Sequence, residues 1–316
     1  MPSWNELVEE FQKLPDDQQR STWLRDKQTE TLKSISSLRG DSNVVFYTSA
    51  FLQKPGAPPP TIQITSEDLN GFMSVIFGMN WSKPLTLLLH TPGGVTNAAE
   101  TIVEYIRSKF AEVEVVVPTY AMSAGTMIAL SSNRIVMGRQ SQLGPIDPQL
   151  VISGTMVSAR AIVDQFEKAK AEILGDVKAG IPGDVRAAHA WAPVLQSLGP
   201  ALLVQAQYAL QYGEEMVGKW LASYMLAGKP DRATLGPQIA NHFNDAGKHK
   251  SHGRRIGREE ARQQGVTIED MEADQRLQDL VLTAYHIATI SFERSVATKV
   301  LATHTGRSWM KAWGPT

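Results

Sequence analysis

Cysteine is absent from the 316 residues of this sequence, and neither sign of charge is in clear excess. Without cysteine, the chain can form no disulfide, no thiolate zinc site and no cysteine nucleophile, and it is compatible with a reducing cytoplasm. Lys and Arg together number 31 and Asp and Glu 32, which gives a formal net charge of -1. Nucleic-acid-binding proteins usually carry a basic patch or stripe, so we expect no nucleic acid partner.

Long apolar runs are absent as well. No stretch approaches the roughly 20 consecutive apolar residues that a membrane-spanning helix needs. The best candidate, residues 201–227, is interrupted by three glutamines, two glutamates and a lysine. The first ten residues carry acidic side chains, and no apolar segment of the kind found in secretory signals follows them. We therefore expect a soluble, unprocessed, cytoplasmic protein without a membrane span.

What the chain does contain is an alternation of short apolar strands and amphipathic helices. Strands are predicted at residues 43–48, 84–90, 113–118 and 135–137, with helices between them. The run at 84–90 is apolar at nearly every position, which is typical of a strand that is buried on both faces. This alternation predicts the α/β class, with a sheet of parallel strands.

The segments on either side of this core have mainly helical patterns. We predict a helical N-terminal arm at residues 1–40, an α/β domain at 41–275, and a C-terminal helix and tail at 276–316. The last helix is expected to run from about Arg276 to Ala302. Trp309 and Trp313 in the tail either contact a partner or pack on the chain's own core.

Two turns of small residues follow consecutive strands of the predicted sheet. The first reads Thr91-Pro-Gly-Gly94. Two glycines between a strand and a helix leave backbone N–H groups uncovered, and these groups can bind an oxyanion near the helix N-terminus. The alternative is a tight strand-to-helix turn with no further role, because Pro and Gly are common in turns.

The second turn reads Ala121-Met-Ser-Ala-Gly125, and it also precedes a helix. Small neighbours let a carbonyl substrate approach the Ser123 hydroxyl, while the N–H of Ala124 points at the developing charge. Read alone, Ser123 is more typical of a helix N-cap. Taken with the first turn, which should be its neighbour in space, it becomes a candidate nucleophile for acyl transfer.

The two motifs together resemble a known superfamily. The segments Leu-His-Thr-Pro-Gly-Gly at 89–94 and Ala-Met-Ser-Ala-Gly-Thr at 121–126 are similar to those of the Clp protease proteolytic subunit and signal peptide peptidase A. The stretches at 123–132, 143–149, 251–254 and 258–261 resemble more closely the serine dehydrogenase proteinases. The likeness covers most of the chain from about Gly40.

This resemblance implies a ClpP/crotonase-like fold, hydrolysis of peptide bonds in a protein or peptide substrate, and assembly into a homo-oligomer. It also implies site residues. Ser123 corresponds to the nucleophile, and Gly93 and Ala124 correspond to the oxyanion donors, with Gly94 adjacent.

The residue that activates Ser123 is left open among several candidates. The Clp subunit uses a histidine after the nucleophile helix, but the corresponding segment here, residues 141–148, contains only Asp147. Asp147 either orients a base or organises its own turn. Signal peptide peptidases use a lysine, which needs a lowered pKa to accept a proton. Lys178, beside a Gly- and Pro-rich loop, is the first choice among the lysines, because Lys168 and Lys170 lie on a charged helix.

Histidine is the other possible base. His252 lies in the family-like Ser-His-Gly stretch and is the second choice after Lys178. His90 precedes the first turn, where a histidine is more often packed and hydrogen-bonded than catalytic. His242 and His249 fall in the same segment as His252, but no set of His, Asp and Glu has a recognised metal-ligand spacing. We therefore expect neither a metal nor another cofactor.

Three functions remain in competition. The leading one is a serine peptidase with a Ser–Lys or Ser–His mechanism centred on Ser123. The second is a crotonase-like enzyme that binds acyl-CoA and stabilises an enolate in a similar oxyanion hole, although such enzymes usually need no serine at this position. The third is a non-catalytic, ClpP-like assembly protein.

Overall fold

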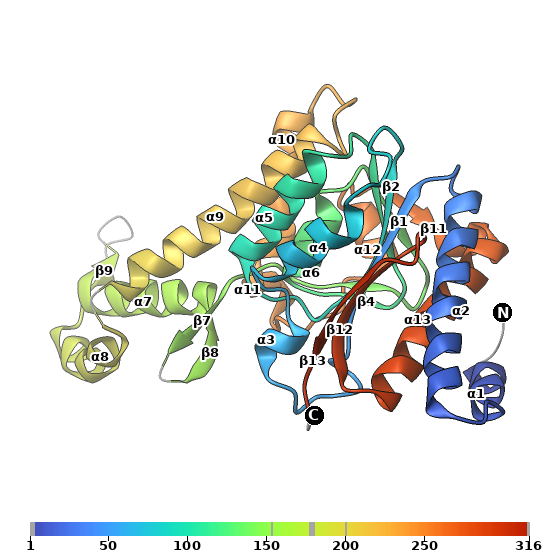
Figure 1. Cartoon of the computed structure of the whole chain (residues 1–316). Helices are drawn as coiled ribbons and strands as arrows, with labels where there is room; N and C mark the ends of the chain where they lie inside the picture. Colours follow the sequence, from blue (N-terminus) through green and yellow to red (C-terminus); the bar gives the residue numbers. More distant parts are fainter. Residues whose placement is uncertain (1–3, 153, 177–180, 200, 315–316) are drawn as a thin grey trace.

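A seven-stranded sheet forms the centre of the computed structural model, which describes residues 4–152, 154–176, 181–199 and 201–314 (Figure 1). The strand order is β11-β5-β3-β2-β1-β12-β13. The first five are parallel to their neighbours, and the last two are antiparallel, so the predicted α/β class with a mainly parallel sheet is confirmed. The strands are β1 (Asn43–Ser49), β2 (Leu85–His90), β3 (Val113–Val117), β5 (Arg134–Met137), β11 (Ile268–Asp270), β12 (Ala297–Thr303) and β13 (Ser308–Ala312).

Helices cover both faces of the sheet (Figure 1). Alternate side chains of β2 enter two separate apolar clusters, Leu87 on one face and Leu88 on the other, and every residue of β2 is buried. This double burial explains the continuous apolar run. The first face is covered by α4 (Asp68–Ile76), α5 (Thr96–Arg107), α6 (Ala124–Leu130), the end of α9 (Leu202–Ser223) and α10 (Arg232–Asn244). The second is covered by α2 (Asp17–Leu38) and α13 (Gln275–Arg294).

Shorter helices complete the body. They are α1 (Trp4–Gln12), α3 (Pro59–Ile62), α11 (Ala246–His249), α12 (Arg258–Gln263) and the 3-10 turn Met271–Ala273. The predicted N-terminal helices are therefore present, and α2 packs along α13 on the second face of the sheet.

An arm projects from the body on the left of Figure 1. It carries a small apolar cluster of its own, in which Ile162 and Leu210 are buried. Its hairpin of β7 and β8 is not among the strands predicted from the sequence. The arm comprises β7 (Gln149–Ile152), β8 (Thr155–Ser158), α7 (Ala159–Leu174), β9 (Gly175–Asp176), β10 (Ile181–Pro182), α8 (Val185–Leu198) and the start of α9.

The C-terminal segment differs from its prediction. The last helix ends at Arg294 instead of about Ala302, because Ser295 is extended and the β-branched residues after it pair with β1. The expected tail forms the edge strand β13, in which Trp309 packs against Gly71 and the first apolar cluster. Trp313 remains exposed. The division into three domains at residues 40 and 275 stays a prediction.

Candidate active site

Ser123 lies between a short strand, β4 (Tyr120–Ala121), and the first residue of α6. Its backbone has φ 51° and ψ -118°, a conformation that serine seldom adopts. Its carbonyl accepts the first hydrogen bond of α6, from the N–H of Met127, but its side chain caps nothing. The helix-capping alternative therefore does not describe the hydroxyl, which makes no hydrogen bond within the described part of the chain.

The turn at Gly93 lies directly against Ser123. Thr91 and Ala121 form a parallel bridge, and Gly93 and Ser123 each lie two residues beyond it. A Cβ atom on Gly93 would lie 2.6 Å from the Ser123 Cβ, and the φ of Gly93 is +100°. A Cβ atom on Gly94 would lie 2.3 Å from the carbonyl oxygen of Ile64. Both positions therefore require glycine, and the predicted neighbourhood of the two turns is present.

Backbone N–H groups surround this contact. The N–H of Gly93 donates to Thr91 Oγ1 at 3.2 Å, which is the long end of the usual range. Among residues 4–152, 154–176, 181–199 and 201–314, we find no acceptor for the N–H of Gly94 or of Ala124. The Ala124 nitrogen lies 3.2 Å from the position that a Gly93 Cβ would take, so the two turns present their donors side by side. Such donors at a helix start can stabilise an oxyanion.

His252 and Asp147 form a second contact pair. His252 Nδ1 lies 2.8 Å from Asp147 Oδ1. The Asp147 carboxylate is buried, and its other oxygen, Oδ2, accepts hydrogen bonds from Gln149 Nε2 at 2.7 Å and Ser158 Oγ at 3.1 Å. The carboxylate is therefore fixed from two sides, and the imidazole that it orients is partly exposed. A neutral imidazole held through Nδ1 in this way presents Nε2 as a proton acceptor.

Strand pairing connects the segments that carry this pair with the segment that carries Ser123. Ala121 pairs in parallel with Leu143 of β6 (Gln142–Leu143), and Leu143 pairs with Ile256 in an antiparallel bridge. Asp147 follows Leu143 by four residues, and His252 precedes Ile256 by four. Because the segment of Ile256 runs antiparallel to that of Leu143, Asp147 and His252 both lie on the same side of the bridge between Leu143 and Ile256. Ser123 lies on this side of its own strand as well, because β4 and β6 are parallel.

The side chain of Thr126 fastens these segments together. Its hydroxyl donates to the carbonyl of Ala121 at 2.6 Å and accepts from the N–H of Gly144 at 2.9 Å. It therefore links the segment before Ser123 to the segment before Asp147. Spacing in the sequence did not indicate this role of Thr126, nor those of Gln149 and Ser158, because each depends on contacts between separate segments.

The candidate lysine bases lie outside the described residues or on the surface of the arm. Lys178 lies outside the described residues. Lys168 and Lys170 are exposed and pair with Glu172 and Glu167 on the surface of α7. These two lysines are thus solvated residues of a charged helix, as their setting in the sequence indicates.

His90 is buried in the second face of the sheet. Its Nδ1 lies 2.8 Å from Thr119 Oγ1, and its ring contacts Phe51, Tyr120 and Tyr285. Burial lowers the pKa of His90 to about 3. A histidine in this position is a packed structural residue, which was the expected alternative to a catalytic base.

No group of three or more His, Asp and Glu side chains within the described ranges could hold a metal ion. His242 and His249 contact each other, and His249 Nε2 lies 2.7 Å from the carbonyl oxygen of His242. Among the helices of the part of the chain that the structure describes, none has the length and apolar character to cross a membrane.

Comparison with known proteins identifies the family. The model of the ClpP-like SDH-type serine proteinases matches residues 31–188, a range that includes Gly93, Ser123 and Asp147 but not His252. Two uncharacterized proteins of Methanocaldococcus jannaschii, MJ0137 and MJ1495, are 45% and 38% identical over 87 residues. These alignments cover 28% of this chain and 30% of each relative, so the chain matches less than a third of their length.

Solved structures show weaker similarity. A variant of the 1510-N membrane-bound stomatin-specific protease has 19% identity and a TM-score of 0.37, over 65% of this chain and 74% of that one. Another variant of that protease, in complex with a substrate peptide, has 21% identity and the same TM-score, over 65% and 70% of the two chains. An enoyl-CoA hydratase from Mycobacterium avium subsp. paratuberculosis K-10 has 14% identity and a TM-score of 0.25, over 61% and 92%. Half of the chain matches the family model, and the chain belongs to the ClpP-like SDH-type serine proteinases.

Proposed function

We propose that this protein is a serine peptidase in which Ser123 is the nucleophile, His252 the general base and Asp147 the residue that orients the histidine. The observation that carries the proposal is the 2.8 Å contact between His252 Nδ1 and Asp147 Oδ1, made by two segments that follow the Ser123 segment in one row of paired strands. A nucleophile, a base and a carboxylate that orients the base are the parts that acyl transfer to serine requires. His252 thereby replaces Lys178 as the preferred base.

The reaction begins with attack of Ser123 Oγ on the carbonyl carbon of a peptide bond. His252 Nε2 takes the hydroxyl proton as the new C–O bond forms, and Asp147 stabilises the resulting imidazolium. The negative charge on the former carbonyl oxygen is bound by backbone N–H groups of Gly93, Gly94 and Ala124. His252 then gives its proton to the departing amine, and water releases the acyl group by the reverse sequence of proton transfers.

The strained backbone at Ser123 supports this assignment. A serine at a sharp turn between a strand and a helix exposes its hydroxyl above the sheet, which is the arrangement of a nucleophile elbow. A conformation with positive φ costs about 1–3 kcal/mol and persists only where its surroundings require it. The contact with Gly93 is such a surrounding.

Neither competing function receives comparable support. Enolate stabilisation on an acyl-CoA would use the N–H groups of the two turns but has no need of Ser123 or of a histidine fixed by a carboxylate. A non-catalytic assembly protein would need neither the backbone strain at Ser123 nor the buried Asp147. Both alternatives predict that the serine can be replaced without loss of function.

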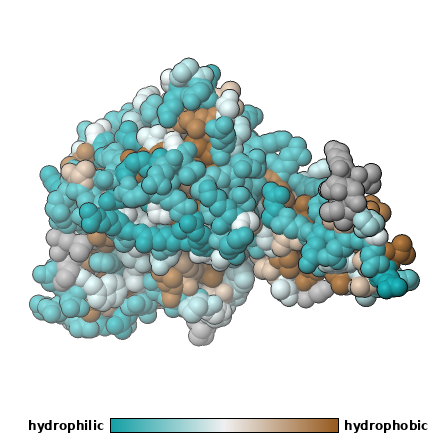
Figure 2. All heavy atoms as spheres, turned by 180° about the vertical axis from the view of Figure 1, so that it is seen from behind, coloured by the Kyte–Doolittle hydropathy of each residue, from teal (hydrophilic) through white to brown (hydrophobic). Residues whose placement is uncertain are grey.

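The arm supports the further proposal that the protein assembles into a homo-oligomer. Large apolar side chains are exposed on it, and Figure 2 shows apolar patches on the arm, which projects to the right in that view. Contiguous exposed apolar surface is typical of contact sites between proteins. The exposed apolar residues of the arm are Val151, Met156, Leu174, Val185, Val204 and Tyr208.

The test of the peptidase is the Ser123→Ala variant. We expect hydrolysis of unfolded casein or of a mixed peptide library to fall by a factor of about 10³ or more, and labelling by a fluorophosphonate probe to disappear. The matched control is Ser131→Ala at the other end of α6, where the hydroxyl donates to the carbonyl of Ile128. Hydrolysis at the normal rate by Ser123→Ala, with the control unchanged, would show that the nucleophile is wrongly assigned.

A further inference from the structure

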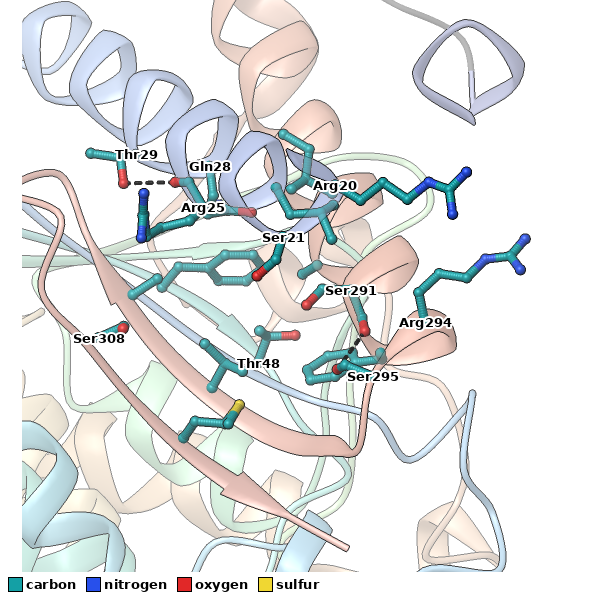
Figure 3. A pocket seen from close by; sticks show the side chains of 18 of the residues that line it. Arg20, Ser21, Arg25, Gln28, Thr29, Thr48, Ser291, Arg294, Ser295 and Ser308 are labelled. Atoms are coloured by element: carbon teal, nitrogen blue, oxygen red, sulfur yellow. Dashed lines mark hydrogen bonds between the residues drawn. The ribbon is translucent and has the colours of Figure 1, made fainter. Parts of the chain in front are cut away.

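A cavity of about 760 Å³ lies between the second face of the sheet and the helices α2 and α13 (Figure 3). None of the residues around Ser123 lines it. The volume falls within the roughly 300–1,000 Å³ of sites that bind small molecules. The cavity is therefore a second candidate site, separate from the proposed peptidase centre.

The floor of the cavity is formed by two rows of residues across β1, β12 and β13. One row is Thr48, Val300 and Met310, and the other is Phe46, Ala302 and Ser308. In each row the residues are directly paired between neighbouring strands, so their side chains share one face of the sheet.

The two walls of the cavity come from facing helices. The wall from α13 is mainly apolar and includes Ile287, Ala288 and Phe292, whereas the wall from α2 is polar or charged except at Leu24. The described helices do not fill the space between these walls and the floor, which leaves a chamber with an apolar floor and one apolar wall for a chain-like ligand.

Four arginines, Arg20, Arg25, Arg294 and Arg307, line the cavity together with the carboxylate of Asp17, so the charged lining residues are positive in sum. Arg20 from α2 and Arg294 from α13 line the cavity and extend toward the same side in Figure 3. Arg20 pairs at 3.1 Å with Asp17, whose side chain is 98% exposed. The Nε atom of Arg20 is buried and has no hydrogen-bond partner. Within the described ranges, we find no ion pair for Arg294. Two guanidinium groups with spare donors at one edge are suited to a carboxylate.

We propose that this cavity binds an anionic amphiphile, an aliphatic carboxylate of the fatty-acid class. The aliphatic chain lies on the floor between α2 and α13, and the carboxylate is held by Arg20 and Arg294. Apolar surface with a few convergent charged groups at one end is the arrangement that binds such molecules. The site does not depend on the reaction at Ser123.

Calorimetric titration of the full chain with decanoate, below the concentration at which it forms micelles, tests the proposal. We expect saturable binding of one decanoate per chain. The double substitution Arg20→Gln with Arg294→Gln should weaken binding of decanoate by about tenfold or more, because charge-assisted hydrogen bonds are lost. Binding of uncharged decan-1-ol should change little in the same variant. Arg276→Gln, at the opposite end of α13, is the control that removes one arginine without touching the cavity.

A cavity-filling variant separates the possible outcomes. Ala302→Trp should abolish binding of both decanoate and decan-1-ol, while Ser123→Ala should bind decanoate as the unmodified chain does. Absence of saturable binding to the unmodified chain, or equal binding by the double arginine variant, would overturn the proposal. A change of oligomeric state in Ala302→Trp, in a chain that binds no decanoate, would instead assign the cavity to an interface between copies.

Discussion

At the scale of single residues, the proposed mechanism depends on how Asp147 holds His252. The buried carboxylate contacts Nδ1 of the imidazole and receives two further hydrogen bonds from Gln149 and Ser158. These contacts fix which ring nitrogen faces away from the carboxylate. The proposed mechanism therefore gives Asp147 both roles considered for it, the organisation of its own turn and the orientation of a base.

Replacement of Asp147 by asparagine should therefore impair catalysis far more than folding. An amide that donates to Nδ1 favours the wrong imidazole tautomer, so we expect kcat to fall by about 10³–10⁴ with a small change in KM. Steady-state kinetics on a peptide substrate measure both constants. Ser158→Ala removes one hydrogen bond to the same carboxylate and should cost less than about tenfold. Similar losses in the two variants would contradict an orienting role for Asp147.

Gly93 is constrained by its contact with Ser123. In Gly93→Ala the added methyl would lie 2.6 Å from the Ser123 Cβ, so one of the two turns must shift and the oxyanion donors move with it. We expect peptidase activity to fall by about 10²-fold or more.

Gly40→Ala is the matched control for Gly93→Ala. Gly40 also has positive φ, at +70°, but a Cβ there would meet nothing within 4 Å. It should lose about 1 kcal/mol of stability through backbone strain and keep its activity. Retention of full activity by Gly93→Ala would show that the close approach of the two turns is not required.

The buried His90 should make stability depend on pH. Its pKa is about 3 in the folded chain and near 6.5 in an unfolded one, so below pH 6.5 only the unfolded chain takes up the proton. The free energy of unfolding then falls by about 1.4 kcal/mol per pH unit, or about 2 kcal/mol between pH 7 and pH 5. His90→Phe should remove this contribution to the pH dependence of the free energy of unfolding, as measured by urea unfolding at the two pH values.

Phe51→Leu serves as the control for the pH experiment. It alters the packing on the same imidazole ring but leaves the proton-binding group in place. It should therefore be destabilised similarly at pH 7 and pH 5. An identical pH dependence in His90→Phe and the unmodified chain would exclude His90 as a source of acid sensitivity.

At the scale of elements, a buried ion pair holds the oxyanion turn against the sheet. Lys299 of β12 and Asp68 of α4 are fully buried and 2.7 Å apart. Lys299 Nζ also donates to the carbonyl of Gln63, and Asp68 accepts from the N–H of Thr65. These two contacts flank Ile64, whose N–H donates to the carbonyl of Gly93. The ion pair therefore fixes the residues on either side of Ile64, to which the Gly93 turn is hydrogen-bonded.

Loss of the lysine should be costly. Lys299→Met leaves the Asp68 carboxylate buried without its cation, and we expect the free energy of unfolding to fall by about 3–5 kcal/mol. Lys311→Met on the neighbouring strand β13 removes a pair with the exposed Glu67 and should cost less than about 1 kcal/mol. Urea unfolding of both variants measures the difference. Equal losses in the two variants would show that burial of Lys299 and Asp68 does not raise the contribution of their ion pair to stability.

Elements with strong local patterns could be predicted, and those that depend on distant pairing could not. Strand β2 is recognisable because burial on both faces makes nearly every residue apolar. Strand β12 is not, because its residues form a strand only when β1 lies beside them. The same holds at the site. Ser123 and Gly93 lie in short motifs, whereas the contact of His252 with Asp147 joins residues 105 positions apart.

At the scale of the whole molecule, the arm is the proposed site of contact between copies of the chain. Its apolar side chains are exposed on a projection with only a small core, so contact with another copy would bury them. The body, in contrast, contains the sheet, the Ser123 turn and the amphiphile cavity. The proposed contact between copies and the proposed site meet at the base of the arm, where Gln149 and Ser158 bond the Asp147 carboxylate.

Charges placed on the arm should therefore dissociate the proposed oligomer. Met156→Glu with Tyr208→Glu introduces two carboxylates at side chains that are 61% and 67% exposed, so folding should be little affected. Light scattering after size-exclusion chromatography should show a lower mass. Met73→Glu, on α4 of the body, is the control with the same charge chemistry and should keep the native mass. An unchanged mass in the arm variant, with an oligomeric unmodified chain, would place the interface elsewhere.

The row of paired segments at Thr91, Ala121, Leu143 and Ile256 has a consequence for the order of events during biosynthesis. The segments that carry Gly93 and Ser123 are neighbours in the chain, but His252 arrives more than a hundred residues later. Contacts between distant residues form late in folding, because a long loop must close first. In the proposed mechanism, a chain that is still being synthesised therefore lacks the base His252 beside Asp147 until residues through Ile256 have left the ribosome. The proposed peptidase would therefore be unable to cleave neighbouring nascent chains for most of its own synthesis.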